Sequence, residues 1–237
     1  MTNAPYHSTP NSGIPHAVVT GTSSGIGRAI AERLISTGWM VTGLDRSPAG
    51  IGHATFRGIE ADLTRTEEIA SILGDITQAN ALVHAAGFMR VGLIGELELD
   101  HGASMWRLHV DAATALANAL AQRLSDGGRI VLIGSRTANG AAGRSQYAAT
   151  KAALVGLARS WAIELAPRNV TVNVIAPAAT DTPFLRDPNR TGTAPVLPPM
   201  GRFVDANEVA ALTAFLLSPE AGSITGQQIV ICAGASL

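Results

Sequence analysis

The chain reads Thr20-Gly21-Thr22-Ser23-Ser24-Gly25-Ile26-Gly27 between a short β-branched run at residues 16–20 and a helical pattern at residues 26–37. Apolar residues recur in that pattern at helical spacing, and Gly38 closes it. Glycines let a backbone turn tightly and approach a ligand closely. The N-terminus of a helix presents free N–H groups and the positive end of the helix dipole. The sequence therefore predicts a strand–turn–helix unit that binds a pyrophosphate.

The rest of the chain alternates between strand and helix patterns. Apolar and β-branched runs predict strands at residues 39–44, 54–59, 81–84, 129–133, 170–175 and 227–231. Helical patterns, two of them opened by capping boxes, predict helices at residues 64–73, 103–124, 145–166 and 205–217. Five prolines between residues 183 and 199 indicate a loop. This alternation predicts a doubly wound parallel sheet of seven strands, covered by helices on both faces.

The same pass along the chain predicts one domain at residues 16–237, because no linker divides the elements. Residues 1–15 lack the basic start and the apolar core of a signal peptide, so we expect a flexible polar tail. No apolar run reaches the roughly 20 residues that a membrane-spanning helix requires. We therefore expect a cytoplasmic protein without a membrane partner.

The charge and the cysteine content narrow the class of ligand. A net charge of −1 provides no field that would attract nucleic acid or an anionic membrane. Cys232 is the only cysteine, and the six histidines lack the spacings of a zinc site. We expect no disulfide within the chain, no nucleic-acid partner and no metal.

Tyr147 and Lys151 form the most informative pair. Lys151 is the only lysine among 17 basic residues, and Tyr147 is one of only two tyrosines. Residues four apart on a helix share one face, with Cβ atoms about 5–6 Å apart. A phenol normally titrates near pH 10, and a neighbouring cation lowers that pKa. The spacing thus favours a phenol that takes up and returns a proton.

Further motifs follow these two in a fixed order. They are Ala85-Ala86-Gly87, Ser135, Asn173-x-x-x-Pro177 and Ile224-Thr225-Gly226-Gln227. With the Gly-x-x-x-Gly-x-Gly turn and Tyr-x-x-x-Lys, they resemble the short-chain dehydrogenase/reductase family from His16 to the C-terminus. The resemblance implies a Rossmann fold and hydride transfer between a nicotinamide dinucleotide and a secondary alcohol or ketone. It also implies that Tyr147 is the general acid/base, that Ser135 orients the substrate oxygen, and that Lys151 lowers the Tyr147 pKa and binds ribose.

Asp45, at the end of the second predicted strand, bears on the choice of dinucleotide. A carboxylate there accepts hydrogen bonds from the adenosine ribose and repels a 2′-phosphate, which favours NAD over NADP. Arg46 meets a phosphate in other members of the family, so NADP is the weaker alternative. By the resemblance, the cofactor-binding residues are Gly21, Ser23, Ser24, Gly25, Ile26, Gly27, Asp45, Arg46, Asp62, Leu63, His84, Ala85, Ala86, Gly87, Tyr147, Lys151, Pro177, Ala178, Thr180 and Thr182.

Three positions depart from the family pattern. His84 replaces the first asparagine of Asn-Asn-Ala-Gly, where it can still donate a hydrogen bond to stabilise the sheet. His109 aligns with a catalytic asparagine that supports a water running to the lysine, with Asp111 as the other candidate. His109 would hold such a water, titrate and make activity pH-sensitive, or simply pack in the helix. Ala178 replaces a glycine after Pro177, at some cost in backbone freedom.

The substrate is the least determined part of the prediction. In this family the loop at residues 183–199 and the surroundings of the catalytic residues set specificity. Four arginines, Arg136, Arg144, Arg186 and Arg190, lie there, and arginine binds carboxylates in a bidentate manner. We therefore expect a small-molecule alcohol or ketone, with a cyclic or acidic diol as one hypothesis.

Two other functions stay open. One is an NADPH-dependent ketoreductase, for example of the 3-oxoacyl type. The other is a nucleotide-binding sensor without catalysis, against which the intact Ser135, Tyr147 and Lys151 argue. Family members usually assemble through the helices predicted here at residues 103–124 and 145–166. We therefore expect a homotetramer, with a dimer as the alternative.

Overall fold

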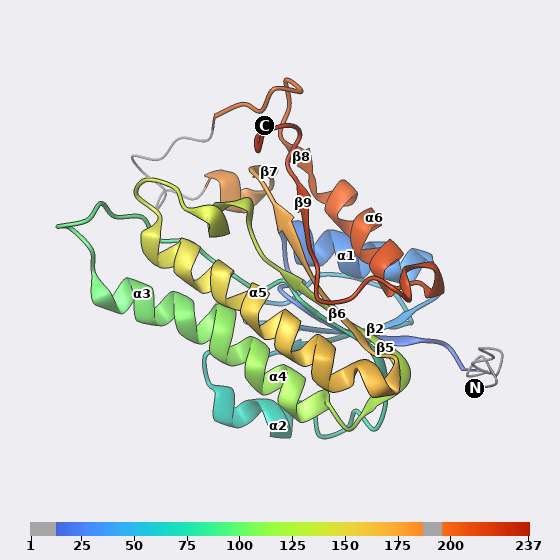
Figure 1. Ribbon diagram of the computed structural model, residues 1–237. Coiled ribbons are helices and arrows are strands. Elements are labelled where there is room, and N and C mark those ends of the chain that lie inside the picture. The colour runs from blue at the N-terminus through green and yellow to red at the C-terminus, as the bar shows by residue number, and fades with distance from the viewer. Residues whose placement is uncertain (1–12, 187–195) are drawn as a thin grey trace, which may run out of the picture.

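The computed structural model describes residues 13–186 and 196–237. Its main feature is a sheet of seven parallel strands in the order β3-β2-β1-β4-β5-β6-β9, which confirms the predicted Rossmann fold (Figure 1). The strands are β1 (His16–Thr20), β2 (Met40–Asp45), β3 (Phe56–Glu60), β4 (Ala79–His84), β5 (Leu124–Ile133), β6 (Thr171–Pro177) and β9 (Gln228–Ile231). The chain order reverses direction between β1 and β4, as in doubly wound sheets.

Helices cover both faces of the sheet. On one face lie α1 (Gly25–Ser36) and α6 (Ala206–Leu217), side by side at the right of Figure 1. On the other lie α2 (Ile69–Ile72), α3 (Leu99–Trp106), α4 (Ala112–Leu120) and α5 (Ser145–Leu165). This layering places the carboxyl ends of the strands at one open edge, where ligands bind in such folds.

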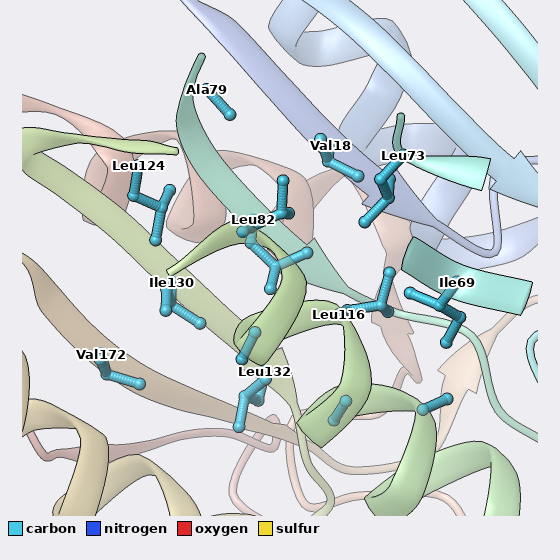
Figure 2. Packing of buried hydrophobic residues seen from close by; sticks show 14 of the residues in the cluster. Val18, Ile69, Leu73, Ala79, Leu82, Leu116, Leu124, Ile130, Leu132 and Val172 are labelled. Carbon is cyan, nitrogen blue, oxygen red and sulfur yellow. The ribbon is translucent and has the colours of Figure 1, made fainter. Parts of the chain in front are cut away.

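Alternate strand residues point into two separate cores. Val18, Leu82, Ile130 and Val172 pack toward α2, α4 and α5, where Figure 2 shows them around Leu116. Their chain neighbours, such as Val19, Val83 and Val131, pack toward α1 and α6. Because successive strand side chains point to opposite faces, a strand buried on both faces is apolar at nearly every position. The short apolar runs of the sequence are explained by this arrangement.

The predicted helix at residues 103–124 is wrong in its bounds and its continuity. The structure has α3, then a π-helical turn Arg107–Asp111, then α4. The chain leaves α4 at Leu120, and β5 begins at Leu124, so Gly127-Gly128 lies inside an irregular strand instead of ending a helix. Glycine permits such irregular strand geometry as readily as it ends a helix, and the residue type alone does not separate the two.

The predicted helix at residues 64–73 is shorter than expected. A 3-10 turn, Thr66–Glu68, precedes the four-residue α2, and neither is capped by a side chain. The turn begins at Thr66 with Arg65 in the N-cap position, so Thr64 lies one residue too early to cap it, and its hydroxyl donates to Asp62 Oδ1 at 2.7 Å. By contrast, the capping box of Asp205 and Glu208 at the start of α6 is confirmed.

One small element has no signal in the sequence. Strands β7 (Thr180–Asp181) and β8 (Val204–Asp205) form a two-stranded parallel sheet. Two residues carry no detectable periodicity. The pairing ties the segment after β6 to the start of α6 and so limits its position over the open edge of the sheet. Of the loop predicted at residues 183–199, the structure describes a 3-10 turn, Pro183–Arg186, and residues 196–199; Arg190 lies outside the described residues, as do residues 1–12 of the predicted tail.

Candidate active site

A cleft with a volume of about 940 Å³ lies at the carboxyl ends of the strands. Segments that follow β1, β2, β3, β4, β5 and β6 all contribute to it. The residues named from the sequence that line it are Gly21, Ser23, Ser24, Gly25, Ile26, Gly27, Asp45, Arg46, Asp62, Leu63, Ala85, Ala86, Gly87, Ser135, Tyr147, Lys151, Pro177, Ala178, Thr180 and Thr182. His84 and His109 are not among its lining residues.

The glycine turn is packed so tightly that it has no room for side chains. A Cβ on Gly27 would lie 2.2 Å from the Gly21 carbonyl oxygen, and a Cβ on Gly21 would lie 2.9 Å from the Ala86 nitrogen. Gly21 also has φ +76, which favours glycine. The side chain of Ser24 does not cap α1, so the first N–H groups of the helix are left for a ligand in the cleft. This cradle fits the pyrophosphate of a dinucleotide.

The carboxylates of Asp45 and Asp62 lie at the end of the cleft that the segments after β2 and β3 form. Asp45 Oδ2 accepts a hydrogen bond from the Ser23 N–H at 2.9 Å, and Oδ1 accepts one from the Ser47 N–H at 3.1 Å. Asp62 accepts two bonds from Thr64, and these bonds lower the pKa of its carboxyl. Both side chains therefore stand as fixed anions where a nucleoside would meet the glycine turn.

Ser135, Tyr147 and Lys151 meet at the opposite end of the cleft, where β5 and α5 adjoin. Lys151 is 4% exposed, and its Nζ donates to the Ile133 carbonyl oxygen at 2.9 Å. The same Nζ lies 5.8 Å from the centre of the Tyr147 ring. Burial lowers the pKa of Lys151 to about 7. Ser135 Oγ accepts the Thr137 N–H at 3.1 Å, and a hydroxyl that accepts this bond still has its own hydrogen to donate. The group can therefore exchange a proton with an oxygen in the cleft.

The segment after β6 closes the cleft near the start of α1. The Thr180 hydroxyl donates to the Ala178 carbonyl, and the Thr182 hydroxyl donates to the Thr180 carbonyl, at 3.0 and 3.3 Å. A Cβ on Gly25 would lie 3.4 Å from the Thr182 Cβ, so this segment faces the glycine turn directly. Ala178 has no positive φ, and its replacement of a glycine therefore brings no backbone strain.

Comparison with known proteins agrees with this geometry. The chain matches the family described as enoyl-(acyl carrier protein) reductase over residues 21–236. The chain belongs to the short-chain dehydrogenase/reductase family. It is accordingly an NAD(P)-dependent oxidoreductase of that family.

Individual members of the family are similar over nearly the whole chain. The 3-oxoacyl-[acyl-carrier-protein] reductase of Salmonella typhimurium is 36% identical over 234 residues, which are 92% of this chain and 96% of that protein. The ligand-free aldohexose dehydrogenase of Thermoplasma acidophilum superposes with a TM-score of 0.86 at 28% identity, covering 94% of each chain. The 3-ketoacyl-(acyl-carrier-protein) reductase of Brucella melitensis, complexed with NADH, gives 0.85 at 26% identity and covers 94% of this chain and 98% of that one.

In this short-chain dehydrogenase/reductase, His84 lies behind the cleft and not in it. Its Nε2 donates to the Leu108 carbonyl in the π-helical turn at 3.0 Å, and its Nδ1 accepts from the Thr20 hydroxyl at 3.0 Å. The Thr20 oxygen in turn accepts the N–H groups of Ala85 and Ala86. Burial lowers the pKa of His84 to about 3, so the ring is neutral. The expected cofactor contact of His84 is thus replaced by a network that fixes the lining segment after β4.

His109 also acts from behind the cleft. Its Nε2 accepts the Phe88 N–H at 3.2 Å, which leaves the proton on Nδ1 to be donated to the Thr150 hydroxyl at 2.8 Å. Burial, with the nearby Lys151 charge, holds the His109 pKa well below its usual value. Both ring nitrogens are therefore engaged by protein groups, and the ring stays neutral. The hypotheses that His109 holds a water or titrates near neutral pH do not fit this geometry, whereas the packed-helix alternative does.

Sequence reasoning missed the apolar wall of the cleft. Phe88 and Met89 directly follow the Ala85-Ala86-Gly87 motif, and this adjacency is a signal in the sequence that they lie near the cleft. The residues of the C-terminal segment give no such signal, because only the fold brings Gly234 close to Pro199. A Cβ on Gly234 would lie 3.3 Å from that proline. Further lining residues are Ser47, Ala61, Thr64, Phe88, Met89, Leu108, Ile133, Gly134, Thr137, Ala179, Gly234, Ala235 and Leu237, with Phe184, Leu185, Val196, Leu197, Pro198 and Pro199 from the loop predicted at residues 183–199.

Proposed function

We propose that this chain transfers hydride reversibly between NAD(H) and the carbon of a hydroxyl or ketone group, working as a ketoreductase. The observation that carries the proposal is the buried Lys151, bonded to the Ile133 carbonyl and held 5.8 Å from the Tyr147 ring at one end of the cleft. The glycine turn that fits a pyrophosphate lines the same cleft. A proton-transfer group and a dinucleotide cradle in one cleft favour a redox reaction at a carbon–oxygen bond.

Each of the three catalytic side chains has its own role in this proposal. Tyr147 gives a proton to the substrate oxygen in reduction and takes it back in oxidation. The ammonium form of Lys151 stabilises the phenolate that remains. Ser135 donates its hydroxyl hydrogen to the same oxygen and stabilises the charge that develops there. A bound nicotinamide dinucleotide would supply or accept the hydride.

NAD(H) is the dinucleotide that we propose, because of Asp45. Its carboxylate is fixed by the Ser23 and Ser47 N–H groups and faces the cleft at the nucleoside end. A fixed anion accepts ribose hydroxyls and repels a 2′-phosphate. Arg46 lines the same end and supports NADP more weakly.

Asp45→Asn tests this choice, since the amide keeps the size of the side chain and removes its charge. We expect the wild type to bind NADH more tightly than NADPH in a fluorescence titration, and the variant to lose most of that difference. Asp75→Asn, at an exposed residue paired with Arg57, is the control. Tighter binding of NADPH by the wild type would contradict the proposal.

The carbonyl compound to test first is a 3-oxoacyl thioester. Relatives named 3-oxoacyl-[acyl-carrier-protein] reductase cover 92% of the chain at 36% identity, which supports the ketoreductase alternative more than the diol dehydrogenase hypothesis. Phe88, Met89, Phe184 and Leu185 give the cleft an apolar wall that suits a short acyl chain.

The experiment follows NADH oxidation with the acetoacetyl thioester of N-acetylcysteamine. We expect turnover by the wild type and at least a hundred-fold loss of kcat in Tyr147→Phe, with NADH binding retained. If NADH binds tightly and neither the thioester nor any ketone of a broad panel is reduced, the sensor hypothesis replaces this proposal.

The homotetramer that we propose would rest on exposed apolar side chains of the α3–α5 layer. Trp106 and Ile163 are 43% and 77% exposed there. The alanines Ala112, Ala113 and Ala117 of α4 do not contribute, because they are buried in the core of the subunit itself. Light scattering coupled to size exclusion, on the wild type and Ile163→Glu, tests this assembly.

A further inference from the structure

Two arginines flank the catalytic residues along the chain. Arg136 follows Ser135 directly and begins a 3-10 turn, and Arg144 precedes α5 three residues before Tyr147. Both are half-buried, and both line the cleft. The Nε of Arg136 is buried and has no hydrogen-bond partner among residues 13–186 and 196–237. Because this Nε atom is covered by protein, a ligand in the cleft would meet Arg136 at its terminal nitrogens, which can donate two parallel hydrogen bonds to a carboxylate.

The carboxylates of the cleft lie at its other end. Among the described lining residues, Asp45 and Asp62 are the acidic ones, and they follow β2 and β3. In the sheet order, β1 and β4 separate those strands from β5, which leads to Ser135. The end of the cleft where reaction takes place therefore carries positive side chains and no lining carboxylate within the described part of the chain.

The other two arginines expected near the substrate do not add to this charge. Arg186 Nη2 lies 2.9 Å from Asp181 Oδ1, both side chains are exposed, and Arg186 does not line the cleft. Arg190 lies outside the described residues. The positive charge beside Ser135 and Tyr147 thus comes from Arg136 and Arg144.

We propose that the substrate carries a carboxylate that Arg136 and Arg144 bind while its carbonyl or hydroxyl carbon faces Tyr147. This inference rests on the proposed function and changes its substrate class from the neutral 3-oxoacyl thioester to oxo and hydroxy acids with an apolar body, which contacts Phe88, Met89 and Phe184. In reduction, hydride from NADH bonds to the carbonyl carbon, and the Tyr147 proton bonds to the oxygen. A hydroxy acid and NAD⁺ are the products, and solvent returns the proton to Tyr147.

Matched pairs of acid and ester test the proposal. The acids benzoylformate, acetoacetate and levulinate place the carboxylate at increasing distance from the ketone, and their methyl esters keep the shape without the charge. We expect the wild type to reduce one acid of the series with a kcat/KM at least about ten-fold above that of its ester. An ester reduced as well as its acid in all three pairs would overturn the inference and leave the proposed function standing.

Arginine variants locate the effect. Arg136→Met keeps the aliphatic stem and removes the guanidinium, and we expect about a 10- to 100-fold loss of kcat/KM on the preferred acid. For the methyl ester of that acid, we expect kcat/KM to change by less than about three-fold in the same variant. Arg136→Lys restores the charge but not the bidentate geometry and is expected to recover part of the loss. Arg33→Met, at an exposed position on α1 away from the cleft, is the control.

A binding measurement separates the two proposals. Benzoate, an unreactive carboxylate, is expected to raise the thermal unfolding midpoint of the wild type with NADH present, whereas benzamide is not. Arg136→Met should abolish the benzoate shift and keep the shift that NADH alone produces. If no substrate is reduced but benzoate still binds in an Arg136-dependent way, the anion site stands and the proposed function falls. Equal shifts by benzoate and benzamide, or a benzoate shift unchanged in Arg136→Met, would overturn the anion site.

Discussion

Lys151 Nζ donates a hydrogen bond to the Ile133 carbonyl oxygen at 2.9 Å, and this bond joins α5 to the end of β5. The lysine is 4% exposed, and burial lowers its pKa to about 7 from 10.5. The Lys151 side chain therefore neighbours both the Tyr147 ring and Ile133, the last residue of β5. Since Lys151 and Tyr147 both belong to the proposed catalytic group, the protonation of Lys151 affects stability and activity together.

The first prediction concerns stability against pH. Between pH 7 and pH 10.5 the unfolded chain holds a proton on Lys151 that the folded chain has released. The release of this proton therefore raises the free energy of unfolding as pH rises through this window, by at most about 1.4 kcal/mol per pH unit. The gain is lost as pH falls toward 7. Urea unfolding of the wild type and Lys151→Met across this range should show the stability difference between them changing with pH. A constant difference would contradict the assignment.

The second prediction concerns His109 as a positioning residue. In His109→Leu the Phe88 N–H loses its acceptor and Thr150 loses its donor, so we expect unfolding to become easier by about 1–3 kcal/mol. KM should rise, because Gly87 and Phe88 line the cleft and a Cβ on Gly87 would lie only 3.0 Å from His109 Nε2. Steady-state kinetics and urea unfolding check both effects.

The conservative variant His109→Gln, whose amide supplies an acceptor and a donor, should recover part of the loss. Because the ring is neutral near pH 7, the shape of the pH–rate profile should be the same in the wild type and in His109→Gln. A pH–rate profile that loses a titration in the variant would show that His109 itself titrates.

The third prediction concerns acid stability. His84 and His109 are both held neutral in the folded chain, with pKa values below the 6.5 of an ordinary histidine. The unfolded chain takes up protons on both as pH falls below 6.5, and the folded chain does not. Stability present above that pH is thus lost as pH falls toward 3, with a slope of up to about 2.7 kcal/mol per pH unit from the two groups together.

Unfolding titrations of His84→Asn should show a shallower loss of stability in acid than the wild type. The exposed His53, replaced by glutamine, serves as the matched histidine control and should leave the slope unchanged. Equal slopes in the wild type and His84→Asn would mean that His84 is already protonated in the folded protein.

Local patterns predicted the parts of the fold that depend on local chemistry. The glycine turn, the Asp205 capping box and the seven strands follow from spacing within a few residues. The π-helical turn at Arg107–Asp111 does not, and the bond from His84 to the Leu108 carbonyl inside it joins residues too far apart in sequence for local spacing to indicate. The capping box predicted at Thr64 is wrong because the helical turn begins only at Thr66, with Arg65 in the N-cap position.

The candidate site shows the same division. Gly21 and Tyr147 lie in the cleft as their motifs predict, whereas Asn173 bonds the Ile224 carbonyl and the Gln227 N–H outside the cleft. His84 and His109 were assigned to the cofactor and to catalysis by alignment with asparagines. Their roles depend on tautomer and partner, which the Leu108 carbonyl and the Phe88 N–H determine. Arg136 and Arg144 follow from their places beside Ser135 and Tyr147, whereas the pairing of Arg186 with Asp181 outside the cleft depends on the fold.

The last prediction uses two glycines of opposite character. In Gly27→Ala the new Cβ would lie 2.2 Å from the Gly21 carbonyl oxygen and 2.7 Å from that of Thr20, and both are backbone atoms that cannot move independently. The glycine turn must open, so we expect NADH binding to fall by at least about ten-fold and unfolding to become easier by about 2 kcal/mol or more. Gly156 is exposed within α5, and a Cβ added there would meet no atom within 4 Å. Gly156→Ala should therefore stabilise the fold by about 0.5–1 kcal/mol and leave NADH binding unchanged. Fluorescence titration and urea unfolding of the two variants side by side measure the contrast, and similar behaviour of both would show that the turn is not a close-packed cradle.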